Sequence, residues 1–60
     1  MNKLIILKKL NHILYLLKEA EQGDMIEEIE EHILLIENDG MIEQDMEECA
    51  EEWQRRYELI

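Results

Sequence analysis

The stretch LIILKKLNHILYLL, residues 4–17, is the part of the chain around which the other segments must pack. Ten of its fourteen residues are apolar, and its only charges are Lys8 and Lys9. Spacings of three and four predict a helix whose core-facing stripe contains Ile6, Leu7, Leu10, Ile13, Leu14, Leu17 and Ala20. Leu4, Ile5, Tyr15 and Leu16 lie outside the stripe. A helix that is apolar on most sides is usually buried on more than one, so we expect it to be central.

The composition predicts an all-α fold in a single domain, residues 1–60. Pro, Ser, Thr, Val and Phe are absent, and 47% of the residues are apolar, with nine Ile and nine Leu. Strand-favouring residues are therefore scarce, while helix formers dominate. A monomer of this length is marginally stable, and it has few interior positions for so many large side chains. We expect an intertwined homodimeric bundle of three-helix protomers, in which the first helix could be exchanged.

Two breaks divide the chain into three predicted helices, over about 3–22, 25–37 and 41–59. At the first, Gly23 should adopt the left-handed conformation that ends a helix, and Asp24 should cap the next one. At the second, residues 38–40 (Asn-Asp-Gly) should join helices two and three into an acidic antiparallel hairpin. An alternative keeps residues 3–37 as one helix, with Gly23 inside it at a cost of about 1 kcal/mol.

The second and third predicted helices each carry one apolar stripe. That of helix two contains Ile26, Ile29, Ile33 and Ile36, and that of helix three Ile42, Met46, Cys49, Ala50, Trp53, Tyr57 and Ile60. Apolar residues away from the stripes, with the aromatic and arginine residues typical of binding hot spots, are candidate interface residues: Ile5, Leu16, Leu34, Leu35, Trp53, Arg56 and Tyr57. Of these, Trp53 also suits the core, which is the interpretation we favour.

Charge is distributed unevenly along the chain, whose net charge is −10. Residues 1–20 carry four Lys and one Glu, for +3, and residues 21–60 carry two Arg and fifteen acids, for −13. Such an acidic body repels phosphate backbones, so direct binding to nucleic acid is not expected. Five glutamates of helix three form a candidate acidic partner surface: Glu43, Glu47, Glu48, Glu51 and Glu52. This surface either keeps the protein dissolved or imitates a nucleic-acid backbone.

No pattern in the sequence indicates catalysis, a metal or another cofactor. His12, His32 and Cys49 lie on three different predicted helices, without the paired spacing of a zinc site. A calcium loop with Gly40 in its sixth position would need Leu35 and Met46 as ligands, and neither supplies a side-chain oxygen. Three short helices also offer little room for a dry active-site cavity. We therefore expect neither an enzyme nor a cofactor-binding protein.

The leading functional hypothesis is a small acidic regulatory protein that binds a larger intracellular protein and inhibits, antirepresses or otherwise modulates it. A DNA-binding regulator is one possible target, and small accessory proteins of phages have a similar size and composition. The alternatives are a nucleic-acid mimic, a purely structural helical oligomer and a membrane-surface protein. The first helix is too short to span a bilayer, which takes about 20 apolar residues. A single cysteine and no cleavage signal suit the cytoplasm, with no membrane association expected.

Overall fold

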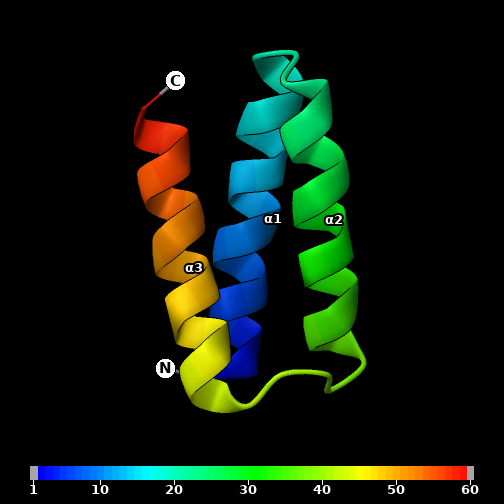
Figure 1. Cartoon of the computed structure of the whole chain (residues 1–60), viewed down its shortest axis with the longest axis vertical. Helices are drawn as coiled ribbons and strands as arrows, with labels where there is room; N and C mark the ends of the chain where they lie inside the picture. Colours follow the sequence, from blue (N-terminus) through cyan, green and yellow to red (C-terminus); the bar gives the residue numbers. More distant parts are fainter. Residues whose placement is uncertain (1, 60) are drawn as a thin grey trace.

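Residues 2–59 are described by a computed structural model in which the chain forms a bundle of three helices. They are α1 (Lys3–Glu19), α2 (Gly23–Glu37) and α3 (Glu43–Glu58). In Figure 1, α1 and α3 run upward and α2 runs downward between them in sequence. All regular structure in the described part of the chain is helical, which confirms the all-α class. Ile60, assigned above to the stripe of helix three, lies outside the described residues.

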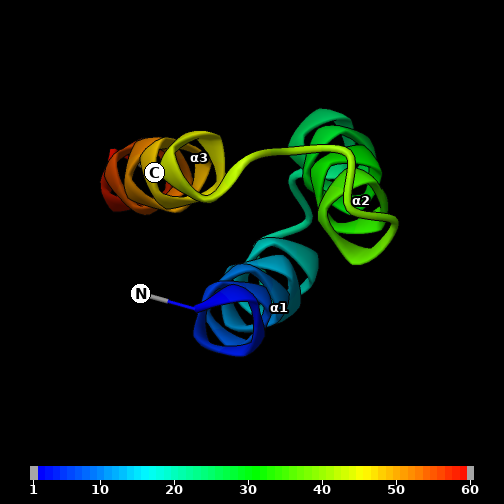
Figure 2. The ribbon, with the colours of Figure 1, turned by 90° about the horizontal axis from the view of Figure 1, so that it is seen from below.

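Helix α1 packs against both other helices, as expected for the central element. Seen along the bundle, α2 and α3 lie side by side over α1, and each contacts α1 more extensively than it contacts the other (Figure 2). The core consists of ten buried residues: Ile6, Leu10, Ile13 and Leu17 from α1, Ile29, Ile33 and Ile36 from α2, and Met46, Ala50 and Trp53 from α3. Leu7, Leu14 and Ile26 lie at its edge and are partly buried, whereas Ala20 and Ile42 are exposed.

Helix α1 ends earlier than predicted, and Gly23 is not the residue that ends it. Glu21 adopts the left-handed conformation, with φ 57°, and no glycine in the described residues has a positive φ. The Gln22 N–H donates to the Leu17 carbonyl at 3.1 Å, and the Glu21 N–H donates to the Lys18 carbonyl at 3.2 Å. This Schellman pattern ends α1 at Glu19, two residues after Leu17, its last buried residue, so the chain reverses where the core positions of α1 end.

The same reversal places the start of α2 at Gly23, so the predicted boundary at Asp24 was wrong. Gln22 occupies the N-cap position, without a side-chain cap, and Asp24 lies inside the first turn. A carboxylate there still interacts favourably with the positive end of the helix dipole. The break at residues 20–22 also contradicts the alternative of one continuous helix over 3–37.

A second Schellman pattern ends α2, with Asp39 rather than Gly40 in the left-handed conformation, at φ 58°. The Gly40 N–H donates to the Leu35 carbonyl at 2.7 Å. Gly40 is needed for this close approach, because an added Cβ would lie 2.5 Å from Leu35 Cδ1 and 3.0 Å from its carbonyl oxygen. The helix α3 then begins at Glu43, two residues later than predicted, with Ile42 at its N-cap.

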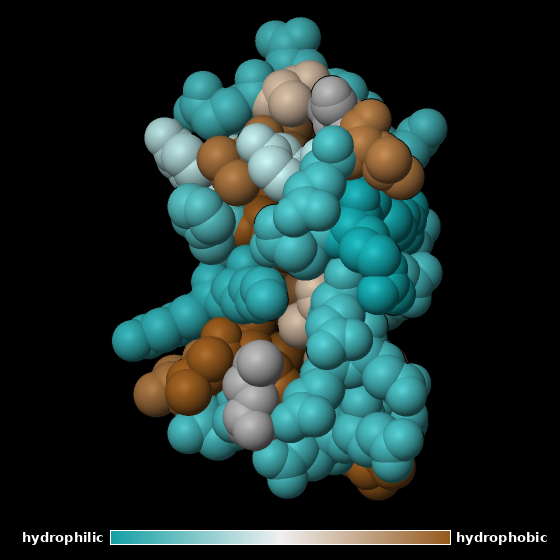
Figure 3. Space-filling model, turned by 90° about the vertical axis from the view of Figure 1, so that its left-hand side faces the viewer, coloured by the Kyte–Doolittle hydropathy of each residue, from teal (hydrophilic) through white to brown (hydrophobic). Residues whose placement is uncertain are grey.

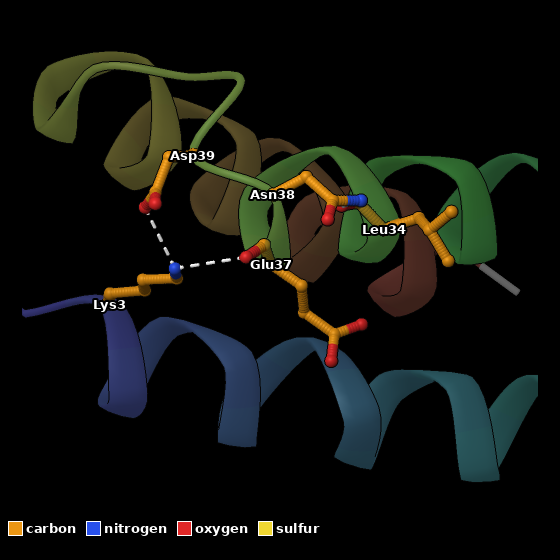
Figure 4. Close-up of polar contacts among 5 residues, drawn as sticks. All are labelled: Lys3, Leu34, Glu37, Asn38 and Asp39. Atoms are coloured by element: carbon orange, nitrogen blue, oxygen red, sulfur yellow. Dashed lines mark hydrogen bonds and ion pairs between the residues drawn. The ribbon is translucent and has the colours of Figure 1, made fainter.

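An ion pair holds this second turn against the beginning of α1. Lys3 Nζ lies 2.8 Å from Asp39 Oδ1 and donates to the Glu37 carbonyl oxygen at 3.2 Å (Figure 4). The lysine thereby satisfies a carbonyl at the end of α2, where the helix dipole favours a positive charge. The contact shows that the flank of α1 that carries Lys3 lies toward the end of α2.

Candidate protein-binding surfaces

The predicted acidic surface lies on the outer side of α3. Figure 3 looks onto this side of the molecule, and hydrophilic side chains cover most of it. Glu43, Glu48, Glu51 and Glu52 are exposed, and Glu47 is partly buried. Within residues 2–59, Glu48, Glu51 and Glu52 form no ion pair. Glu48 and Glu51 therefore present exposed carboxylates that have no ion-pair partner in the described chain.

A shallow groove of about 280 Å³ separates α2 from α3. Its lining residues are His32, Met41, Asp45, Glu48, Cys49 and Glu52. Two of the five predicted acidic residues, Glu48 and Glu52, thus border the groove. Glu51 is not among its lining residues, so the acidic surface is not one flat face.

Beside this groove, Trp53 connects α3 to α2 through a hydrogen bond. Its side chain is 1% exposed, and its Nε1–H donates to Nδ1 of His32 at 2.8 Å. The two rings meet edge to face, with centroids 5.8 Å apart. Trp53 is therefore a core residue whose polar atom is satisfied. The sequence analysis considered His32 only as a metal ligand and did not foresee this partnership.

Arg56 also binds within the chain. Its guanidinium carbon lies 4.1 Å from the centroid of the Trp53 ring, and its Nη1 donates to the Glu28 carboxylate. This hydrogen bond from Arg56, with the positive charge behind it, lowers the pKa of Glu28 below its ordinary value, and it raises the pKa of Arg56. Tyr57 is partly buried against the core. The three candidates on α3 thus mainly join helices, and Arg56 and Tyr57 remain partly accessible.

The Glu28–Arg56 contact should make part of the stability depend on pH. Because folding lowers the pKa of Glu28 from 4.5, its contribution is complete above that pH and is lost as pH falls below it, through the lower pKa of the folded state. We expect Glu28→Gln to lower the free energy of unfolding at about pH 7 and to change it little at about pH 2. Urea unfolding at both pH values measures this. Glu27→Gln, at an exposed carboxylate without an ion pair in the described chain, is the control. Equal effects of Glu28→Gln at both pH values would contradict it.

The apolar interface candidates differ in accessibility. Leu34 and Ile5 are 61% and 51% exposed, and Leu35 is 45% exposed with its side chain beside Gly40. Leu16 is partly buried. Leu4 and Tyr15, which the sequence analysis left off the candidate list, are as exposed as Leu34. The sequence pattern could have identified Leu4 and Tyr15 as exposed, because both fall outside the core stripe of α1.

Cys49 and the two histidines do not converge on a metal site. Within residues 2–59, no group of three or more His, Cys, Asp and Glu side chains is placed to hold a metal ion. Burial raises the pKa of the Cys49 thiol, and the neighbouring Glu52 carboxylate raises it further. A thiol held in its protonated form is a weak nucleophile. In the described residues, no helix is both long and apolar enough to cross a membrane.

Comparisons of the chain with family models, with curated proteins and with solved structures returned no significant match.

Proposed function

We propose that this protein is a small acidic regulator that binds a larger intracellular protein and inhibits, antirepresses or otherwise modulates it. The observation that carries the proposal is the amount of apolar surface left uncovered. Among residues 2–59, seven large apolar side chains are at least 45% exposed: Leu4, Ile5, Tyr15, Leu34, Leu35, Ile42 and Leu59. Covering these side chains with a partner protein would lower the free energy of this 60-residue chain in water. Contiguous apolar surface commonly marks protein contacts.

A second candidate, a nucleic-acid mimic, is supported by the negative surface of α3. Exposed carboxylates without an ion pair in the described chain, such as Glu48 and Glu51, can approach a basic site that normally binds phosphates. A DNA-binding regulator is the kind of partner that offers such a site. The two candidates differ in salt dependence, since exposed charge pairs are screened whereas apolar contacts are not.

Affinity capture from an extract of the source cell, at low and at moderate salt, tests both candidates. The bait is the tagged chain, compared with Glu48→Lys/Glu52→Lys and with a matched control of equal charge, Glu19→Lys/Glu21→Lys. A regulator should retain a specific protein at moderate salt, and the purified chain should change that protein's activity. For a mimic, capture should fall at least tenfold with salt and be lost in the α3 variant alone.

Two further outcomes would overturn a regulatory role. Capture of no specific protein would leave a purely structural oligomer as the better interpretation. Co-sedimentation with anionic vesicles, lost on Lys8→Glu/Lys9→Glu, would indicate a membrane-surface protein instead. The proposal places the protein in the cytoplasm, where its free Cys49 would stay reduced.

We also propose that the working unit is a homodimer. The described chain closes α1 onto its own α2 and α3, so a dimer can form either between two closed protomers or by exchange of α1. Both forms would cover apolar side chains that a monomer leaves in water. Size-exclusion chromatography with light scattering at low micromolar concentration tests the dimer, and a stable folded monomer would contradict it.

A further inference from the structure

The side of α1 and α2 that faces away from α3 is at the lower right in Figure 2. Both helices carry incompletely buried apolar residues on this side. On α1, Lys3 contacts the end of α2, so the flank of Lys3 lies toward α2. On α2, Glu28 and His32 contact α3. Helical spacing then places six such residues on the outer face of the pair: Leu4, Leu7, Leu14 and Tyr15 from α1, and Ile26 and Leu34 from α2. We call this the α1–α2 face.

The two helices that form the α1–α2 face have opposite net charge. The residues of α1 sum to +3, from four Lys and one Glu, and those of α2 sum to −6, from six acids. On α2, Glu27, Glu30 and Glu31 surround Leu34 and line a shallow hollow. An apolar face that is basic on one helix and acidic on the other is complementary to a copy of itself.

We propose that the α1–α2 face binds the same face of a second copy, with α1 of each protomer lying on α2 of the other. A two-fold axis parallel to the helices produces this arrangement, in which neighbouring helices are antiparallel, as in a four-helix bundle. An axis perpendicular to the helices would instead stack α1 on α1 and α2 on α2, with like charges opposed. The inference rests on the homodimer proposed above and names the surface that forms it.

The register of the helices identifies the charged pair to test. Lys3 lies level with Glu37, and both helices rise by about 1.5 Å per residue. Lys8 lies five residues further along α1. It is therefore level with position 32 of the antiparallel helix α2, one residue from Glu31. Both side chains are exposed on the outer edge of the face, and neither forms an ion pair in the described chain. Across the two-fold axis, Lys8 of one copy meets Glu31 of the other.

Reciprocal charge reversal tests this arrangement by light scattering. We expect Lys8→Glu and Glu31→Lys each to weaken dimerisation at least tenfold, because each places two like-charged pairs in the dimer. Mixing the two variants in equal amounts should restore it, since every pair in the mixed dimer is then of opposite charge. Circular dichroism checks that each variant remains helical. Glu51→Lys and Arg55→Glu, on the outer side of α3, are matched controls that should dimerise normally.

The possible failures are distinguishable from one another. If the unmodified chain is monomeric, both the homodimer and this surface are overturned. If it is dimeric and the single variants remain so, or if mixing restores nothing, the surface is wrong and the homodimer stands. Carbodiimide coupling between labelled and unlabelled copies of the unmodified chain adds a test that needs no variant. A Lys8–Glu31 bond between copies supports the proposal, and inter-copy bonds that join the lysines of α1 only to carboxylates of α3 contradict it.

Discussion

Replacement of Trp53 with alanine is expected to lower the free energy of unfolding by about 3–5 kcal/mol. The side chain is 1% exposed and belongs to the core cluster to which all three helices contribute. Removing a buried tryptophan costs about 3–5 kcal/mol, because the cavity left behind closes only in part. A 60-residue domain has about 3–9 kcal/mol of stability in all. The substitution therefore removes a large share of the free energy of unfolding.

Far-UV circular dichroism during urea unfolding measures this effect, since the variant lacks the chain's one tryptophan. Trp53→Phe is the matched control, because it keeps an aromatic ring in the core and removes the N–H that donates to His32. Loss of that hydrogen bond and the smaller ring should together cost about 1–2 kcal/mol. A Trp53→Ala variant as stable as Trp53→Phe would show that the ring does not hold α3 against the bundle.

Replacement of Leu10 with alanine is the second change expected to have a large effect. Leu10 is fully buried in the middle of α1, where both other helices pack on this one helix. A Leu→Ala change at such a site costs about 2–5 kcal/mol. Helix propensity cannot account for the loss, because alanine is the better helix former. We expect the midpoint of urea unfolding to fall steeply, with the helices lost in a single transition.

The same chemical change at Leu59 provides the control for Leu10. Leu59 is 89% exposed at the end of α3, so Leu59→Ala should change the free energy of unfolding by less than about 0.5 kcal/mol. Both variants are compared by urea unfolding under identical conditions. Similar losses at the two positions would contradict the assignment of α1 as the central helix.

Local spacing was sufficient to predict the helices and most of the core. Ile6, Leu10, Ile13 and Leu17 recur at intervals of three and four, and such a pattern buries one side of a helix whatever it packs against. The acidic side of α3 was predictable for the same reason. Glu48, Glu51 and Glu52 fall opposite the apolar stripe. Side chains on that side of the helix cannot reach the core, so they face water.

The helix boundaries were less predictable, because glycine was taken as the signal for the left-handed residue. Glu21 and Asp39 take that conformation instead, at a cost that glycine would avoid. The position of each reversal depends on where the last core residue lies, Leu17 in α1 and Ile36 in α2. Packing of the helices thus determines the residue at which the chain reverses, and Glu21 and Asp39 adopt the left-handed conformation that the reversal requires.

By itself, the sequence determined the all-α class, the division into three segments and the contrast between a basic first helix and an acidic remainder. Each of these follows from residue type and spacing within one helix. Only the tertiary structure decided that Trp53 donates to His32, 21 residues away, and that Arg56 pairs with Glu28, 28 residues away. Such pairs depend on how α2 and α3 are rotated over α1, and that rotation is the outcome of packing all three stripes at once.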